Sequence, residues 1–166
     1  MKKIIFSSVA IFAMVVSGCS SKNASVSTSS SVDSNGASGG RDNFANINDR
    51  IDNLNNTLNK VYFDFDKFNI RTDMQPVVKN NSDIFNNEVA GVSITVEGNC
   101  DEWGTDEYNQ ALGLKRAKAV KQALISNGVS ADRISIKSYG ETNPVCTEKT
   151  KACDALNRRA EFKLSR

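Results

Sequence analysis

The chain has 166 residues, of which 39% are hydrophobic and 24% are charged, and these proportions are typical of a soluble domain with a hydrophobic core. Without residues 1–18, which carry Lys2 and Lys3 but no acidic residue, 19 of the 21 basic residues balance 19 acidic ones. Such a chain lacks the basic excess that indicates a nucleic-acid partner. We therefore expect one compact domain with additional segments.

The apolar run at residues 4–16 has the form of a secretory signal peptide. Its 13 residues are too few to cross a bilayer, which takes roughly 20. The following VSGC, at residues 16–19, resembles the lipobox of bacterial lipoproteins. This resemblance implies cleavage before Cys19 and acylation of Cys19 with fatty acids such as palmitate. The alternative is a plain secretory signal with an incidental cysteine.

Acyl chains on Cys19 would hold the protein on a membrane that it does not cross. Ser20 stands where an aspartate retains such lipoproteins in the inner membrane, so the resemblance implies the outer membrane, with the domain facing the periplasm. The serine-rich stretch that follows has no aromatic residue and cannot bury enough surface to offset its ordering entropy. Residues 19–42 are therefore predicted to be the acylated cysteine and a flexible tether.

A short amphipathic helix is predicted over residues 43–59. Its apolar residues recur at spacings of three and four, which places them on one helical face: Phe44, Ile47, Ile51, Leu54 and Leu58. Two positions are open for this helix: it docks on its own domain, or it docks on a partner.

The globular domain is predicted over residues 60–166. Alternation of apolar and polar residues predicts four strands, around Val61–Phe65, Val92–Val96, Ile134–Ile136 and Ala160–Leu164. Thr72 and Gln75 match a capping box for a helix that reaches about Phe85, with a proline in its first turn. Thr105 is the expected N-cap of a long helix over residues 106–127, which Gly128 ends. The order β-α-β-α-β-β predicts an α+β sandwich, with helices packed on a mixed four-stranded sheet.

An arginine interrupts the apolar face of the long helix. At 100° per residue Arg116 falls in the middle of a face made by Tyr108, Leu112, Ala119, Val120, Ala123 and Leu124. A buried guanidinium needs acceptors, and helical side chains lean toward the helix N-terminus, which brings Arg116 toward the loop that holds Asp101. Asn109 lies on the same stripe, and Asp66 joins the pocket if the first two strands are neighbours. Asp101 and Arg116 either form a private ion pair or stay apart to bind a zwitterion.

Several stretches resemble, in order, those of the peptidoglycan-associated lipoproteins and, more widely, of the C-terminal domain of outer-membrane protein A. They are VYFDFDKFNIR (61–71), VEGNCDEWGTDEYNQALGLKRAKAV (96–120), SYGETNP (138–144) and NRRAEF (157–162). The resemblance implies that the chain binds, without a covalent bond, the stem peptide of peptidoglycan through its meso-diaminopimelate residue. It also implies TolB and TolA-type Tol proteins as partners, in a system that supports envelope integrity and cell division.

The same resemblance assigns residues to the diaminopimelate site. Asp101 takes the ammonium group of the ligand, and Arg116 takes the carboxylate in bidentate fashion. Further positions that match the pocket are Phe65, Asp66, Asn109, Leu112 and, more weakly, Arg159. The chain departs from the family pattern at three places: Asn99 where histidine is common, Cys100 where alanine or threonine is common, and Trp103 where an arginine often lies.

Enzyme chemistry is not expected. The sequence has no histidine, no GxSxG, no P-loop and no HExxH, so it lacks the motifs of most hydrolases and metalloenzymes, and no metal or cofactor is predicted. Cys146 and Cys153 are too far apart in sequence for a thioredoxin motif. In an oxidising periplasm they are expected to form a structural disulfide, which leaves Cys100 free. The competing interpretation is a structural envelope lipoprotein that acts through protein contacts and has an internal Asp101–Arg116 pair.

The lipobox gives a first prediction. Cys19→Ala removes the acylated residue, so the variant is expected to leave the membrane fraction or to keep its signal peptide. Cell fractionation followed by mass spectrometry of the N-terminus measures both outcomes. A variant that still sediments with the outer membrane after a high-salt wash would contradict the lipobox.

Overall fold

The computed structural model describes residues 42–166, so the predicted signal peptide, the acylated Cys19 and the tether lie outside the described residues. Within residues 42–166, no helix is long and apolar enough to span a bilayer. The elements follow in the order α1 (Asp42–Thr57), β1 (Val61–Tyr62), α2 (Gln75–Asn87), β2 (Ser93–Asn99), α3 (Asp106–Ser126), β3 (Ile134–Gly140), α4 (Lys151–Asn157) and β4 (Arg159–Ser165).

The four strands form one mixed sheet in the order β1-β4-β2-β3, which confirms the predicted fold class. Strand β4 pairs antiparallel with both β1 and β2, and β2 pairs parallel with β3. Two features differ from the prediction. Strand β4 separates β1 from β2, so the first two strands are not neighbours. The short helix α4, held between β3 and β4, was not expected.

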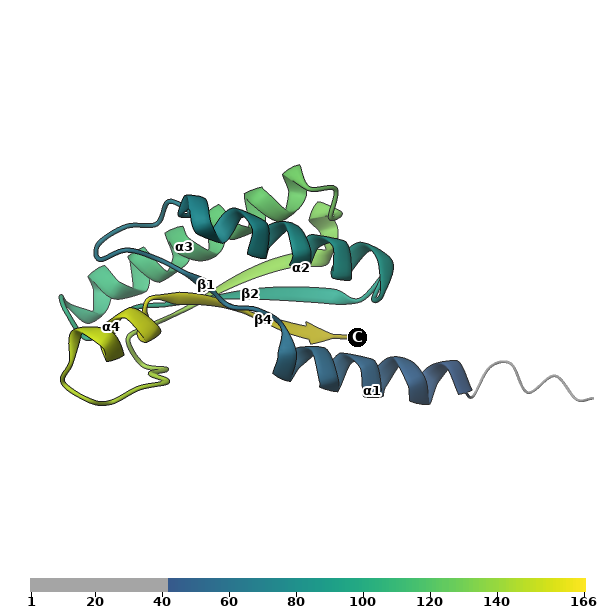
Figure 1. Ribbon diagram of the computed structural model, residues 1–166, viewed down its shortest axis with the longest axis horizontal. Coiled ribbons are helices and arrows are strands. Elements are labelled where there is room, and N and C mark those ends of the chain that lie inside the picture. The colour runs from purple at the N-terminus through teal and green to yellow at the C-terminus, as the bar shows by residue number, and fades with distance from the viewer. Residues whose placement is uncertain (1–41) are drawn as a thin grey trace, which may run out of the picture. The chain divides into compact units, whose positions relative to one another are not determined.

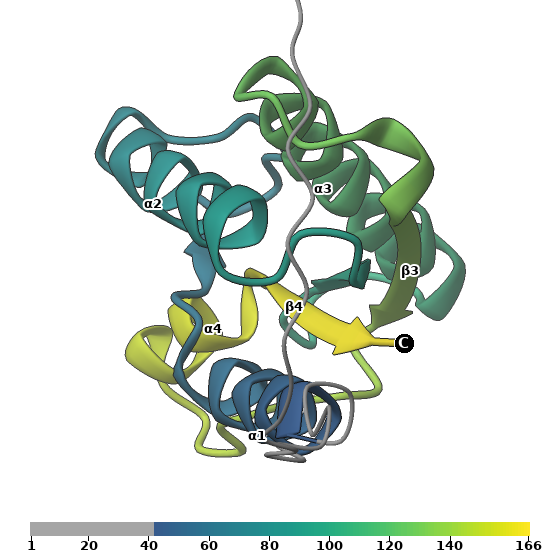
Figure 2. The ribbon, with the colours of Figure 1, turned by 90° about the vertical axis from the view of Figure 1, so that its right-hand side faces the viewer.

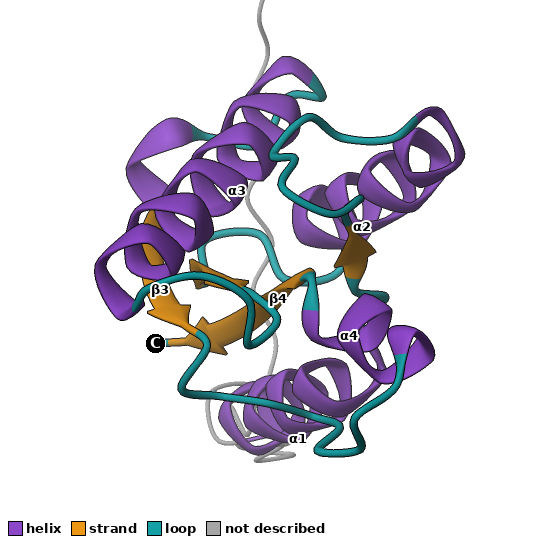
Figure 3. Ribbon diagram, turned by 90° about the vertical axis from the view of Figure 1, so that its left-hand side faces the viewer, coloured by secondary structure: helices purple, strands orange, loops and turns teal. Residues whose placement is uncertain are grey.

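Helices cover both faces of the sheet, as Figures 1 and 2 show. Helices α2 and α3 lie on one face and α1 lies on the other, an arrangement that Figure 3 repeats from the opposite side. Ile51 and Leu54 of α1 are buried in the core. The Asn55 side chain accepts a hydrogen bond from Leu164 N (2.7 Å) and donates one to Leu164 O (3.3 Å). Helix α1 therefore docks on its own domain, along β4.

The first strand is shorter than its alternating pattern predicts. Only Val61 and Tyr62 pair with β4, which begins at Arg159, so the chain leaves the sheet when the ladder ends. Phe63 is still buried, but Phe65 is 60% exposed. The expectation that Phe65 continues the core face of this strand is therefore wrong.

The two long helices begin in different ways. Thr105 caps α3 as predicted, because its side chain accepts a hydrogen bond from Tyr108 N, and Gly128 follows the helix with a φ of 91°. The predicted capping box at Thr72 is wrong: a 3-10 turn (Thr72–Met74) precedes α2, and no side-chain cap is formed there. Pro76 occupies the first turn of α2, as expected.

The buried face of α3 differs from the predicted stripe by a small rotation. Tyr108 is 49% exposed, and the face that packs on the sheet consists of Asn109, Leu112, Gly113, Arg116, Ala117, Val120 and Leu124. Arg116 lies within this face, as the helical wheel predicts.

Two glycines bring α3 into backbone contact with β2. A Cβ atom on Gly98 would lie 1.9 Å from the carbonyl oxygen of Gly113. A Cβ atom on Gly113 would in turn lie 2.3 Å from Ser138 Oγ of β3. Larger residues would push the helix away from the strand ends, so this close approach fixes the N-terminal half of α3, including Asn109 and Arg116, against the sheet.

This contact gives a second prediction. Gly98→Ala is expected to lower the free energy of unfolding by about 1–3 kcal/mol, because backbone atoms that cannot rotate away must shift. Urea denaturation of both proteins measures the change. Ser93→Ala, on an exposed position of the same strand, serves as the control and should change stability by less than about 0.5 kcal/mol. Equal midpoints for wild type and Gly98→Ala would contradict the close contact.

Candidate functional site

Arg116 is completely buried and joins three segments of the chain. Its Nε donates to Lys67 O (2.9 Å), and one terminal nitrogen donates to Asp64 O (3.3 Å). The other terminal nitrogen donates to Asn99 O (2.8 Å) and contacts Cys100 Sγ (3.3 Å). The guanidinium thus ties α3 to the end of β2 and to the loop that follows β1.

The charge of Arg116 has no carboxylate partner among the described residues. Its hydrogen-bond acceptors are neutral carbonyl groups and a thiol, and its guanidinium carbon lies 5.2 Å from the centre of the Phe63 ring. Burial lowers the pKa of Arg116, although arginine stays protonated in proteins. Carbonyl dipoles and an aromatic face therefore solvate a buried positive charge that no carboxylate at ion-pair distance neutralises.

Asp101 is also buried, at 3% exposure, but it pairs with Arg158 rather than with Arg116. Arg158 lies 2.9 Å from Asp101 Oδ2 and also donates to Phe63 O (3.2 Å). The private Asp101–Arg116 ion pair weighed as the competing interpretation is therefore wrong. Sequence reasoning missed Arg158, and the available signal was that Arg158 is the first of two adjacent arginines in the NRR stretch (157–159).

Arg159 does not face this site. Its side chain is fully buried and donates to Glu161 (2.8 Å), to Asn157 O (3.3 Å) and to Asn143 O (3.1 Å). Burial raises the pKa of Glu161, but hydrogen bonds from Arg159 and Lys60 outweigh burial and hold that pKa below its usual value. Arg159 therefore has a full set of structural partners, and the neighbouring Arg158 is the arginine that reaches Asp101.

Asn109 fixes the loop that carries Asp101. Its side-chain nitrogen donates to Asp101 O (3.3 Å), to Trp103 O (3.2 Å) and to the Glu141 carboxylate. Its side-chain oxygen is buried and has no hydrogen-bond partner within residues 42–166. Leu112, one turn later on α3, is buried. Asn109 thus sets the loop conformation through its side-chain nitrogen, while its side-chain oxygen remains an unused acceptor.

The loop after β1 covers Arg116. Asp66 has a φ of 56°, a conformation that is uncommon for a residue other than glycine, and its carboxylate accepts a hydrogen bond from Tyr108 Oη. This bond raises the pKa of Tyr108. The predicted proximity of Asp66 to the pocket is therefore found, although the loop produces it and not a neighbouring strand. Phe65, beside Asp66, points its ring into solvent.

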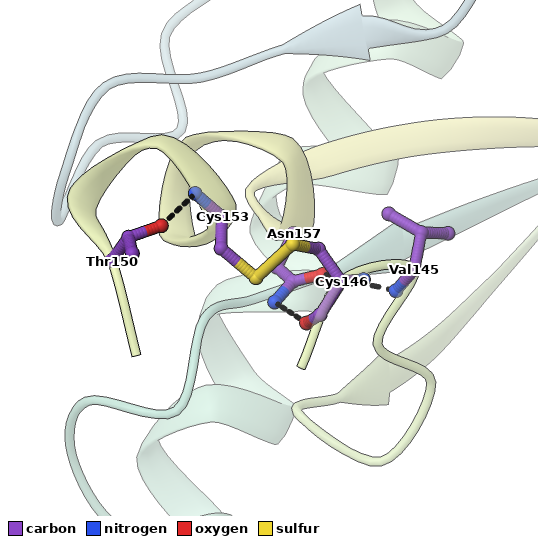
Figure 4. Close-up of a disulfide and its surroundings, with 5 residues drawn as sticks. All are labelled: Val145, Cys146, Thr150, Cys153 and Asn157. Carbon is purple, nitrogen blue, oxygen red and sulfur yellow. Dashed lines mark hydrogen bonds between the residues drawn. A yellow bond between two sulfur atoms is a disulfide. The ribbon is translucent and has the colours of Figure 1, made fainter. Parts of the chain in front are cut away.

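A disulfide holds the segment opposite the Asp101 loop. Cys146 and Cys153 are bonded, as expected, with their Cα atoms 5.3 Å apart. Figure 4 shows that Thr150 caps α4 through Cys153 N and that the Asn157 side chain binds the backbone of Val145 and Cys146. The disulfide, the cap and the Asn157 amide together define this loop.

Cys100 is the one free cysteine among the described residues, and its side chain is buried. Burial raises the pKa of the Cys100 thiol to about 11, and the nearby positive charge of Arg116 only partly opposes this effect. The thiol donates to Asn109 O (3.4 Å). Cys100 is therefore a neutral packing residue at neutral pH and not a nucleophile.

The chain matches the OmpA family over residues 62–158, more than half of its length. The chain belongs to the OmpA family. Its relatives include a peptidoglycan-associated lipoprotein of Mesorhizobium japonicum, which is 36% identical over 163 residues covering 95% of this chain and 90% of the relative. Another, from Pasteurella multocida, is 42% identical over 110 residues covering 66% of this chain and 73% of the relative.

The fold of this OmpA-family protein also resembles a solved structure. The crystal structure of the peptidoglycan-associated lipoprotein from Burkholderia pseudomallei superposes with a TM-score of 0.60 at 37% identity, covering 64% of this chain and 89% of the other. The family resemblance and the fold class predicted from the sequence are confirmed. OmpA-family proteins are structural proteins, so the expectation that the chain is not an enzyme is also confirmed.

The environment of Cys100 gives a third prediction. At pH 8, a thiol with a pKa of about 11 is ionised about a hundredfold less than one with the ordinary value of 9.0, so native Cys100 should be alkylated at least that much more slowly than in urea. Because the folded pKa is raised, the stability contributed by the neutral thiol is present below pH 9.0 and is lost as the pH rises toward 11.

Timed alkylation with iodoacetamide, followed by mass spectrometry of the Cys100 peptide, measures these rates without interference from other cysteines. Equal rates in native and urea-unfolded protein would contradict the buried thiol. Peptide mapping under non-reducing conditions provides the control, because it should find Cys146 linked to Cys153 and Cys100 unlinked.

Proposed function

We propose that this protein is an outer-membrane lipoprotein that binds the diaminopimelate-containing stem peptide of peptidoglycan and so tethers the outer membrane to the cell wall. The family assignment and the names of the relatives support peptidoglycan association. The lipobox-like VSGC supports an anchor at Cys19. The binding domain would then lie on the periplasmic side, at the end of the serine-rich tether.

The observation that carries this proposal is the unneutralised charge of Arg116 near the buried Asp101 carboxylate. The free end of meso-diaminopimelate bears an ammonium group and a carboxylate on one carbon. A carboxylate accepts two parallel hydrogen bonds from a guanidinium and adds the attraction of opposite charges, which a neutral carbonyl group does not supply. Arg116 would therefore gain stability if a ligand carboxylate replaced backbone carbonyl groups as its hydrogen-bond acceptor.

Ligand entry requires the loop after β1 to lift. In the structure, Asp64 O and Lys67 O accept hydrogen bonds from the guanidinium, and the hydrogen bond from Tyr108 to Asp66 ties the loop to α3. Phe65 is largely exposed, so lifting the loop exposes little of its apolar surface. We infer that the ligand carboxylate replaces the carbonyls of Asp64 and Lys67 and that Phe65 and Asp66 close again over the bound peptide.

The ammonium group has its own place in this arrangement. Asp101 offers a carboxylate with four lone-pair sites, of which Arg158 uses one in the structure, so an ammonium can join Arg158 there. The unpartnered Asn109 oxygen lies on the residue that holds the Asp101 backbone and provides a second acceptor in that region. Leu112, from the same helix, supplies apolar surface for the methylene groups of the ligand.

The family resemblance also supports TolB and TolA-type Tol proteins as partners, and a role in envelope integrity and cell division. The other candidate, a structural envelope lipoprotein that acts mainly through protein contacts, is less well supported. Its premise was an internal Asp101–Arg116 pair, and the structure pairs Asp101 with Arg158 instead.

The charged site gives a fourth prediction. Asp101→Asn keeps the side-chain shape but removes the charge, and Arg116→Lys keeps the charge but removes the guanidinium fork. Loss of one member of a buried charge pair commonly costs about 2–5 kcal/mol, so Asp101→Asn should bind diaminopimelate-containing sacculi more than tenfold more weakly than wild type. Arg116→Lys should also bind more weakly, because an ammonium group cannot form the two parallel hydrogen bonds of a guanidinium with a carboxylate. Sedimentation with purified sacculi measures the bound fraction, and circular dichroism with thermal unfolding checks that each variant is folded.

Two controls accompany this measurement. Asp83→Asn removes an exposed carboxylate of α2 and should leave binding unchanged. Sacculi with lysine in place of diaminopimelate keep the ammonium group but lack the second carboxylate, and they should bind wild type far more weakly. Wild-type binding by folded Asp101→Asn, or equal binding to both kinds of wall, would refute the proposed ligand.

A further inference from the structure

Trp103, the only tryptophan of the chain, is 59% exposed although it is the largest apolar side chain available to the core. Its indole Nε1 donates to Asp154 Oδ2 of α4 at 3.0 Å. The polar edge of the ring is therefore bound to the protein, while more than half of the side chain faces solvent. A large exposed ring whose orientation is fixed in this way has the features of a binding surface.

Hydrogen bonds hold both the backbone and the indole ring of Trp103 in place. The Trp103 backbone carbonyl accepts from Asn109, the same amide that holds the Asp101 carbonyl. Asp154, which binds the indole edge, follows Cys153 of the disulfide, and α4 is capped by Thr150. Ordering of this ring on ligand binding should therefore cost little entropy, because the free protein already orders it.

A small cavity lies between the Trp103 loop and the disulfide segment. Its volume is about 230 Å³, and Cys100, Glu102, Glu141, Cys146 and Asp154 contribute to its walls. Three of its carboxylates have protein partners, with Glu102 bound to Lys149, Glu141 to Asn109, and Asp154 to Trp103, whereas the Glu148 carboxylate, also in the wall, has none within residues 42–166. Each of these carboxylates keeps unused lone pairs, which suit hydroxyl and amide donors. The cavity is smaller than the roughly 300–1,000 Å³ of pockets for drug-sized ligands, so it suits a single compact polar group.

We propose that Trp103 is a stacking platform for a sugar ring of the peptidoglycan glycan strand. This inference rests on the proposed function, because it requires the stem peptide to bind at Asp101, two residues away. The stem peptide is joined to the glycan, and an extended peptide spans only about 3.3–3.6 Å per residue, so a sugar of the same strand stays within reach of the Trp103 loop. The apolar face of a pyranose ring covers the indole, and its hydroxyl groups meet the carboxylates of the cavity.

A glycan is favoured over a cationic occupant by the state of the carboxylates. A site for a free ammonium group would need an uncompensated carboxylate at the ring face, whereas Asp154 is bound at the indole edge and Glu102, beside Trp103 in sequence, is paired with Lys149. Glu148 is the unpaired carboxylate of the cavity wall, so a cation is tested as the competing occupant. A neutral sugar requires only acceptors and an open aromatic face. An anionic ligand is disfavoured by the same carboxylates.

The test uses two soluble ligands that share one diaminopimelate-containing stem peptide: the free peptide and the same peptide attached to its disaccharide. Titration calorimetry with the intact protein in detergent should show that the disaccharide form binds about threefold to tenfold more tightly than the free peptide. Because Trp103 is the only tryptophan, intrinsic fluorescence reports on it directly, and its emission should change with the disaccharide form but not with the peptide alone.

Variants separate stacking from loop positioning. Trp103→Ala should bind both ligands with the affinity of the free peptide, and Trp103→Phe should retain part of the preference for the disaccharide form. Ile125→Ala, which removes an exposed apolar side chain at the far end of α3, should keep the full preference. Loss of peptide affinity in Trp103→Ala equal to its loss of disaccharide affinity would overturn the proposal, because Trp103 would then act only by positioning Asp101.

The remaining outcomes are also decisive. Equal wild-type affinity for the two ligands overturns the sugar platform and leaves the proposed function standing. A Trp103 emission change with tetramethylammonium but none with the disaccharide form identifies a cation site and overturns the sugar platform. Binding of neither ligand by wild type overturns the proposed function and this inference together.

Discussion

The buried guanidinium of Arg116 is the constraint on which the rest of the site depends. It is fully enclosed, and its donors reach carbonyl groups of the loop after β1 and of the end of β2. Burial of a charge without good hydrogen bonds is expensive, so these segments must stay where their carbonyls can solvate it. The close contact between Gly98 and Gly113 then places α3 near enough to the strand ends for the side chain to reach them. One charged side chain thus organises three segments that are far apart in sequence.

Asp101 and Arg158 form a second, separate unit. Arg158 lies where α4 meets β4, and it binds both the Asp101 carboxylate and the Phe63 carbonyl. The disulfide and the Asn157 amide fix the segment before it. The two charges that a zwitterion would meet are therefore held by independent sets of contacts. Asp101 and Arg116 do not pair with each other, which is the condition for a site that binds both charges of a zwitterion.

The sequence contained enough information for the fold and for the central residues, but not for their partners. Periodicity located all four strands and the long helix, and the position of Arg116 within an apolar face indicated a buried charge. The spatial order of the strands depends on long-range pairing, which local patterns do not encode, so β4 was not expected between β1 and β2. The alternating pattern continues to Phe65, but the strand does not, because β4 offers no residue for pairing beyond Tyr62. Arg158 and Arg159 are adjacent, and only the geometry of the α4–β4 junction decides which of them faces Asp101.

Under the proposed function, the unequal state of the two charges determines which part of a ligand the site selects. Asp101 is already compensated by Arg158, so an ammonium group must share or displace that partner and gains only the difference. Arg116 has no carboxylate at ion-pair distance among the described residues, so a ligand carboxylate supplies an interaction that the free protein lacks. A ligand with an ammonium group but no carboxylate contacts Asp101, which Arg158 already pairs, and leaves Arg116 without a carboxylate partner. Under the proposed function, discrimination between diaminopimelate and lysine therefore follows from the arginine, because the aspartate contacts the ammonium group that both ligands share.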